Sequence, residues 1–149
     1  MSQNPHQNSG HRQNAIVTIA RKVHFSSGHR YFNSRLSDEE NKKIFGKHYS
    51  THGHGHNFTL EGYFNGPINP ESGLVINLIE IDQLLKKVSD PFDHHFINTD
   101  VPYFKDVVPT TENIATYLYK ELKKELKNPG VQLLKVRLYE GDTFWVDVQ

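Results

Sequence analysis

Four segments of the chain show the alternation of apolar and polar residues that is typical of β-strands. In the first, every second residue from Val17 to Phe25 is apolar except Arg21. The last two are joined by a short turn around residues 140–142 and are predicted to form a hairpin. The predicted strands are residues 16–25, 57–64, 131–139 and 144–148.

Two longer stretches have apolar residues at helical spacing instead, residues 77–88 and 110–126. Asn77 and Thr110 stand at their predicted N-caps, and Glu80 is placed to complete a capping box with Asn77. Residues 30–47 form an excursion between the first two strands. It contains a capping box of its own, Ser-Asp-Glu-Glu at residues 37–40, which predicts a short helix that ends at Gly46.

The order of elements is therefore strand, excursion, strand, helix, helix, strand, strand. Two helices between two strand pairs predict an α+β domain, with both helices on one face of a four-stranded antiparallel sheet. Residues 1–15 are polar and are predicted to be a disordered tail, which leaves residues 16–149 as a single domain.

Composition narrows the function classes. Seventeen basic and 17 acidic residues cancel, so no electrostatic footprint for nucleic acid is expected. The sequence has no apolar run near the roughly 18 residues of a membrane span and no signal-peptide pattern, so a cytoplasmic protein is expected. The absence of cysteine means that any metal site must use nitrogen or oxygen ligands.

The most unusual stretch is residues 46–58, G-K-H-Y-S-T-H-G-H-G-H-N-F. On an extended strand, His52, His54 and His56 would share one face, with successive members about 7 Å apart. Two such imidazoles can reach one metal ion, and zinc is the first candidate. A solvated loop that binds metal non-specifically is the alternative, and the spacing alone does not name a third ligand. His29, just past the first predicted strand, is a plausible ligand or simply a hydrogen-bonded side chain.

Three further places carry ionisable residues with two interpretations each. Asp93 and His94 lie between Phe92 and Phe96, and can be a carboxylate with its base or merely a turn. The segment Thr110-Thr111-Glu112 can contribute to a binding site or only cap a helix. Glu140, at a strand end beside a turn, would ordinarily be solvated.

Taken together, eight motifs in order give the chain a family resemblance. It resembles the 6-pyruvoyl-tetrahydropterin synthases, and also the related bacterial 6-carboxytetrahydropterin synthases of queuosine biosynthesis. Two of the motifs, L-S-D-E-E-N and D-V-P-Y-F, favour the pyruvoyl branch. The motifs are F-S-S-G-H at 25–29, L-S-D-E-E-N at 36–41, F-G-K at 45–47, G-H-G-H-N at 53–57, D-H at 93–94, D-V-P-Y-F at 100–104, T-T-E-N at 110–113 and Y-E at 139–140.

The resemblance implies the tunnelling fold, in which subunits form a ring and two rings stack into a homohexamer with active sites between subunits. It implies one zinc per subunit, held by three histidines that match His29, His54 and His56, so that His52 is not a ligand. Glu112 matches the residue that anchors the pterin ring, with Thr110 and Thr111 beside it. Glu140 matches a second active-site glutamate, and Asp93 with His94 matches the family's catalytic pair.

The reaction implied by the resemblance converts 7,8-dihydroneopterin triphosphate. A zinc ion with open coordination positions acts as a Lewis acid on the vicinal hydroxyls of the side chain. A base then removes a proton, the side chain and ring exchange oxidation states, and triphosphate leaves. No external redox cofactor is required.

One position departs from the family pattern, because the catalytic cysteine after F-G-K is replaced by His48. His48 can be the base, since neutral imidazole accepts a proton near neutral pH. It can be a fourth zinc ligand that closes the metal site. The change can also redirect the reaction to cleavage of the side chain, giving 6-hydroxymethyl-dihydropterin; Glu61 does not occupy the position of a replacement base.

The resulting hypothesis is a zinc-dependent lyase acting on the pterin side chain, with His48 as base and Asp93 and His94 assisting. The alternative from another class is a catalytically silent protein that binds zinc and pterin.

Overall fold

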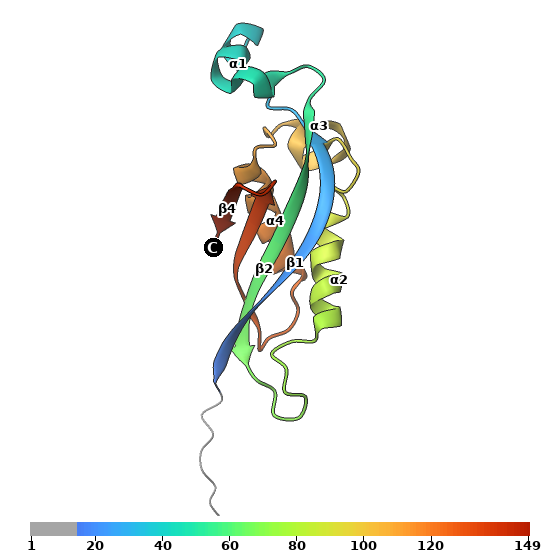
Figure 1. Ribbon diagram of the computed structural model, residues 1–149, viewed down its shortest axis with the longest axis vertical. Coiled ribbons are helices and arrows are strands. Elements are labelled where there is room, and N and C mark those ends of the chain that lie inside the picture. The colour runs from blue at the N-terminus through green and yellow to red at the C-terminus, as the bar shows by residue number, and fades with distance from the viewer. Residues whose placement is uncertain (1–14) are drawn as a thin grey trace, which may run out of the picture.

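The computed structural model describes residues 15–149, so the predicted tail lies, apart from Ala15, outside the described residues. The predicted α+β fold is confirmed: four antiparallel strands form one sheet in the order β1-β2-β3-β4 (Figure 1). The strands are β1 (Ile16–His29), β2 (His54–Pro67), β3 (Gln132–Glu140) and β4 (Phe144–Val148).

Strands β1 and β2 are longer than their apolar alternation predicts. They pair without interruption from Ile16 opposite Pro67 to His29 opposite His54. The prediction ended the first strand at Phe25 and began the second at Asn57, because the paired residues beyond those points are serine, glycine and histidine. These residues carry no apolar signal, yet the backbone ladder continues through them and places the histidines on regular strands.

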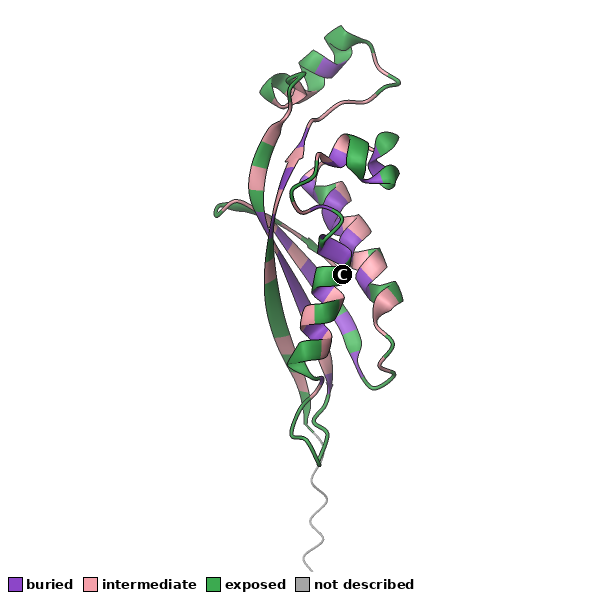
Figure 2. Ribbon diagram, turned by 90° about the vertical axis from the view of Figure 1, so that its right-hand side faces the viewer, coloured by how far each residue is buried: buried purple, intermediate pink, exposed green. Residues whose placement is uncertain are grey.

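The two long predicted helices, α2 (Leu78–Ser89) and α4 (Thr111–Glu125), cover one face of the sheet (Figure 2). The short helix α1 (Asp38–Phe45) has the predicted capping box and projects beyond the end of the β1–β2 ribbon (Figure 1). For α2 the structure shows the Asn77 cap bond to the Ile79 amide, without the Glu80 half of the predicted box. Short turns that the pattern did not predict are α3 (Ile97–Asp100), η1 (Gly46–Tyr49) and η2 (Pro102–Lys105).

The hydrophobic core lies between the sheet and these helices. Phe58, on the inner strand β2, is fully buried and stacks on Phe25 of β1 with ring centroids 5.1 Å apart. Arg21, which interrupts the apolar alternation of β1, lies on the helix side and is paired with Asp82 of α2 at 2.7 Å. Within residues 15–149, none of the helices has the length and apolar character needed to cross a membrane.

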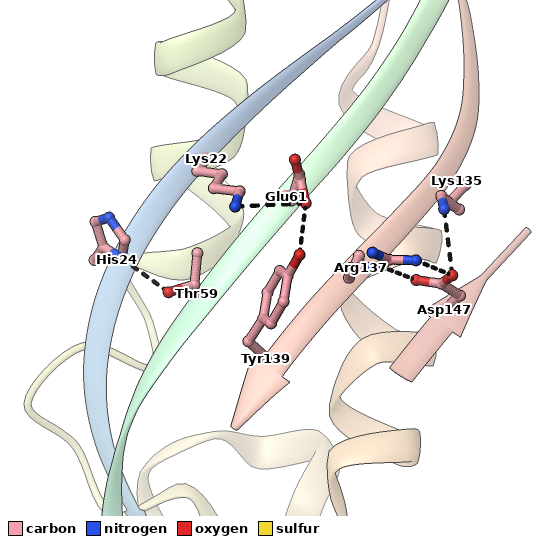
Figure 3. Close-up of polar contacts among 8 residues, drawn as sticks. All are labelled: Lys22, His24, Thr59, Glu61, Lys135, Arg137, Tyr139 and Asp147. Carbon is pink, nitrogen blue, oxygen red and sulfur yellow. Dashed lines mark hydrogen bonds and ion pairs between the residues drawn. The ribbon is translucent and has the colours of Figure 1, made fainter. Parts of the chain in front are cut away.

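The opposite face of the sheet is polar, and Figure 3 shows its main contacts. Glu61 in the middle of β2 is nearly buried there; it accepts a hydrogen bond from the Tyr139 hydroxyl at 3.2 Å and lies 4.0 Å from the Lys22 ammonium. This arrangement directs Glu61 to the face opposite the helices. We refer to this surface, made by the side chains shown in Figure 3, as the open face.

One ion pair on the open face is expected to stabilise the fold in a pH-dependent way. Arg137 donates two hydrogen bonds to Asp147, at 2.6 and 2.8 Å, and this lowers the pKa of the Asp147 carboxyl to about 2 from 3.8. Because the folded-state pKa is lowered, the pair stabilises the fold above about pH 4, and that stabilisation is lost as the pH falls toward 2. Asp147→Asn should therefore lose less stability than the wild type between about pH 5 and pH 2.

Thermal unfolding followed by circular dichroism across that range measures the effect. Asp142→Asn, which removes an exposed carboxylate in the turn between the same two strands, is the matched control and should retain the wild-type pH dependence. Superimposable curves for Asp147→Asn and the wild type would show that the pair contributes nothing.

Candidate functional site

Three histidines converge where the β1–β2 ribbon approaches its end. His29 is the last residue of β1 and pairs across the ladder with His54, while His56 follows two residues along β2 on the same face. One possible ligand atom from each lies within 4.8 Å of the others, which is a separation that a single metal ion can bridge. Their ring centroids are 4.6 to 5.3 Å apart. The sheet register thus places His29 beside the tract as the third potential ligand. The spacing of the histidines alone could not identify it.

The buried ring nitrogens of these histidines suit a metal. His29 is fully buried and its Nδ1 donates to the Pro109 carbonyl at 2.8 Å, which leaves Nε2 as the lone-pair nitrogen. Burial lowers the pKa of the His29 imidazole to about 4 and also lowers the pKa of His54. The Nε2 atoms of all three histidines are buried without a hydrogen-bond partner. Three unpartnered imidazole nitrogens so close together form a donor set that could hold a metal ion.

Glu140 and Thr111 lie beside this cluster. A Glu140 carboxylate oxygen is 3.1 Å from His56 Nε2, but the pair does not have hydrogen-bond geometry, so Nε2 keeps its lone pair for another partner. The other carboxylate oxygen accepts a hydrogen bond from the buried Thr111 hydroxyl. Glu140 is therefore anchored inside the site, contrary to the solvated position that its place beside a turn suggested.

The first turn of α4 carries the other residues of this group. The Thr110 hydroxyl is the N-cap and accepts from the Asn113 amide at 3.2 Å, as the sequence predicted. Glu112 is exposed in the same turn. The start of α4 therefore places Thr111 toward the histidines and Glu112 toward solvent.

His48 lies next to the cluster without joining it. Its ring centroid is 5.2 Å from that of His54, but the group of histidine and acidic residues close enough to share a metal comprises, within residues 15–149, only His29, His54 and His56. His52 is exposed and is also outside the group. The structure thus separates the histidines of residues 46–58 into two potential ligands and two that are not.

Tyr31 is a site residue that the sequence analysis missed. Its ring stacks on His48 with centroids 5.2 Å apart and meets the edge of His29 at 5.2 Å. Burial raises the pKa of its hydroxyl, and the Glu140 carboxylate adds to that effect. The available signal was its position two residues after His29, which would place both side chains on one face if the chain stayed extended.

Asp93 and His94 form a pair at the edge of β1. Asp93 accepts a hydrogen bond from the Ser26 amide at 2.9 Å, which lowers the pKa of its carboxyl, and lies 3.0 Å from His94 Nδ1. His94 is largely exposed and has a left-handed backbone, φ +59°, while its own amide donates to the Ser26 carbonyl at 2.6 Å. A strained residue held by its neighbours is typical of functional positions.

His94 borders an open groove of about 530 Å³ whose lining includes Ser26, Asn57 and also His56. The Ser26 and Asn57 side chains are bonded at 2.7 Å and point to the open face, because they alternate with residues that point toward the helices. Asp93 and His94 therefore lie at the edge of β1 toward the open face, where His56 is the member of the histidine cluster that shares the groove with His94.

The loop that carries Asp93 and His94 packs closely against the backbone at Gly53. The φ of Gly53 is +70°, and a Cβ there would come within 2.6 Å of the Phe96 ring and 2.8 Å of the His29 carbonyl. Phe96 also packs against Gly28, where an added Cβ would be 3.1 Å from the ring. The segment that carries Asp93 and His94 is thus packed directly against the strand ends that carry the histidines.

Comparison with known proteins identifies the relatives of this arrangement. The family model described as 6-pyruvoyl tetrahydropterin synthase matches residues 18–149. A 6-pyruvoyl tetrahydrobiopterin synthase from Pongo abelii is 44% identical over 125 residues, covering 83% of this chain and 85% of the relative. The solved 6-pyruvoyl tetrahydropterin synthase of Caenorhabditis elegans superposes with a TM-score of 0.86 at 38% identity, covering 91% of this chain and 96% of that one.

A more distant relative is named for a different activity. A dihydroneopterin monophosphate aldolase from Pyrococcus furiosus is 33% identical over 97 residues, which cover 64% of this chain and 77% of the relative.

Proposed function

Because the chain belongs to the 6-pyruvoyl tetrahydropterin synthase family, we propose that it is a zinc-dependent lyase whose substrate is 7,8-dihydroneopterin triphosphate. The reaction would eliminate triphosphate while the side chain and the ring exchange oxidation states. The observation that carries the proposal is the convergence of three buried, unpartnered Nε2 atoms from His29, His54 and His56.

These three residues would hold the zinc ion. When bound, zinc supplies Lewis acidity toward the hydroxyl oxygens of the substrate side chain, because three protein ligands leave a position open. The hydrogen bond from His29 Nδ1 to the Pro109 carbonyl fixes the ring orientation that this role needs.

His48 would be the base that removes the side-chain proton. Its ring lies beside His54 and outside the ligand group, which favours a base over a fourth ligand. Neutral imidazole accepts a proton near neutral pH, so the residue type suits the task. The family's cysteine at this position would serve as a proton acceptor next to the metal, and His48 would take over that role.

The pterin ring would bind at the start of α4. Its 2-amino-4-oxo-pyrimidine edge presents paired N–H donors, which a carboxylate accepts in a bidentate contact. Glu112 is exposed and can receive them, with Thr110 and Thr111 beside it. Glu140, already bonded to Thr111 and next to His56, would face the reacting side chain.

Asp93 and His94 would complete the site of a neighbouring subunit. In one chain the pair lies at the edge of β1 toward the open face, which would allow it to act with the histidine cluster of a second copy. We therefore propose a homohexamer, a dimer of trimers, with each active site formed between subunits.

A second outcome has specific support, namely cleavage of the side chain to 6-hydroxymethyl-dihydropterin. His48 stands where the family has cysteine, and the chain is similar to a dihydroneopterin monophosphate aldolase. Retro-aldol cleavage begins by deprotonating a hydroxyl rather than a carbon, so it needs a weaker base.

Product analysis by mass spectrometry, with zinc-loaded protein and 7,8-dihydroneopterin triphosphate, tests the proposal. We expect the 6-pyruvoyl product together with released triphosphate. A 6-hydroxymethyl product would establish the cleavage reaction in its place. A 6-carboxy product would assign the chain to the queuosine branch, and bound zinc and pterin without any product would indicate a silent binding protein.

A further inference from the structure

We propose that Tyr31 is a positioning residue for His48 and holds the imidazole of this base next to the three-histidine group. The inference rests on the proposed function, because it assigns a partner to the residue named there as the base. It concerns the aromatic ring of Tyr31, not the ionisation of its hydroxyl.

His48 needs such a partner because of where it sits. It belongs to η1, a four-residue 3-10 turn without a side-chain cap, on the excursion that leaves the sheet after β1. Such a short turn does not by itself fix the direction of a side chain. A base must nevertheless be held within a few tenths of an ångström to act efficiently.

Tyr31 is connected to His48 through both backbone and ring. The Tyr31 amide donates to the His48 carbonyl at 3.0 Å. The two rings are stacked, with an interplanar angle of 29° and centroids 5.2 Å apart. On its other sides the Tyr31 ring meets His29 at 5.2 Å and Phe45 at 5.9 Å, both edge to face. The ring is therefore fixed between a metal-binding histidine and the base.

The neighbours of Tyr31 restrain the same turn from its other side. The Arg30 guanidinium lies over the rings of Phe32, at 4.3 Å, and Tyr49, at 5.0 Å, and its Nε donates to the Tyr49 carbonyl at 3.2 Å. The Tyr49 hydroxyl in turn donates to Asp38 of α1 at 2.7 Å. Within residues 30–32, the Tyr31 side chain thus contacts His48, while the Arg30 side chain contacts Tyr49 and Phe32.

The test compares two substitutions at Tyr31 in the zinc-loaded protein. Tyr31→Phe keeps the ring and should keep kcat within about twofold, whereas Tyr31→Leu removes the ring and should lower kcat by up to about 100-fold with little change in KM. Tyr31→Met is a second variant without an aromatic ring, in case Tyr31→Leu does not fold. Tyr119→Leu, which removes a tyrosine ring from the middle of α4, is the matched control and should behave as wild type.

A second measurement does not depend on turnover. In NMR spectra of histidine-labelled protein, the His48 ring signals, assigned by their loss in His48→Gln, should be displaced by the ring current of the stacked tyrosine. Tyr31→Leu should remove that displacement and Tyr31→Phe should retain it, with zinc content equal in all variants.

These outcomes separate the inference from the proposed function. If the wild type turns over substrate and Tyr31→Leu retains its kcat, or Tyr31→Phe falls as far as Tyr31→Leu, the positioning role is wrong and the proposed function stands. If the wild type gives no product, the proposed function fails. The NMR displacement alone then decides whether Tyr31 fixes the ring of His48.

Discussion

His54→Ala should abolish stoichiometric zinc binding and turnover together, whereas His52→Ala, two residues away in the same tract, should leave both unchanged. The reason is geometric: His54 contributes a buried, unpartnered nitrogen to the three-histidine group, and His52 is exposed outside it. Two remaining ligands do not hold zinc in a protein site of this kind. Zinc content by atomic absorption and triphosphate release by turnover assay measure the two effects.

Thermal unfolding gives an independent readout of the same substitution. At a free zinc concentration about 100 times Kd, binding should stabilise the wild type by about 2.7 kcal/mol, and His54→Ala should show no such zinc-dependent shift. An equal loss of zinc in His52→Ala would mean that the tract binds metal non-specifically. Retention of zinc by His54→Ala would exclude the three-histidine site.

His48→Ala should lower turnover by about 10²- to 10⁴-fold, the usual contribution of a general base, without changing zinc content. His48 lies beside the cluster rather than within it, so its removal leaves all three ligands in place. His48→Cys restores the family's own residue at that position and should recover much of the lost rate. Single-turnover kinetics, with pterin binding measured separately, distinguish a lost base from a lost substrate contact.

The two alternative roles of His48 give different results in the same experiment. Loss of zinc from His48→Ala would identify a fourth ligand, and unchanged turnover would show that another residue is the base. A change of product in His48→Cys, from 6-hydroxymethyl to 6-pyruvoyl, would show that this one position selects the reaction.

Local pattern predicted the elements of the fold because each is encoded by neighbouring residues. The apolar spacing of α2 and α4 and the capping box at Ser37 are signals within a few positions, and the structure confirms them. The strand ends are different, because the Ser-Gly-His residues at 27–29 have no apolar alternation and extend only because a partner strand lies opposite. That partner is 25 residues away for His29 and His54, which are paired in the ladder, and no local signal reports it.

The functional site, like the fold, could be predicted only where the signal lies in neighbouring residues. The histidine tract indicated metal chemistry by residue type, but His29 joined the ligand group only through the resemblance, since its place depends on the sheet register. Glu140 looked solvated by its turn position and is instead bonded to Thr111, a contact between residues 29 positions apart. Tyr31 was missed because residues 30–47 were assigned to an excursion, so its position two residues after His29 was not used. The location of Asp93 and His94 at the edge of β1 depends on the tertiary path of the loop after α2.

The two glycines between the alternating histidines, Gly53 and Gly55, differ in the substitutions that they would tolerate if this segment were transplanted into another protein. A Cβ added at Gly55 would meet only ordinary contacts, at 3.4 Å or more, so a small β-forming residue could replace this glycine in a designed hairpin. Gly53 has a left-handed backbone, and a Cβ there would lie 2.8 Å from the His29 carbonyl as well as against the Phe96 ring, so glycine is needed even without that ring. A designer would therefore have to copy the paired ends of β1 and β2, which together carry His29, His54 and His56, and to keep Gly53 with them.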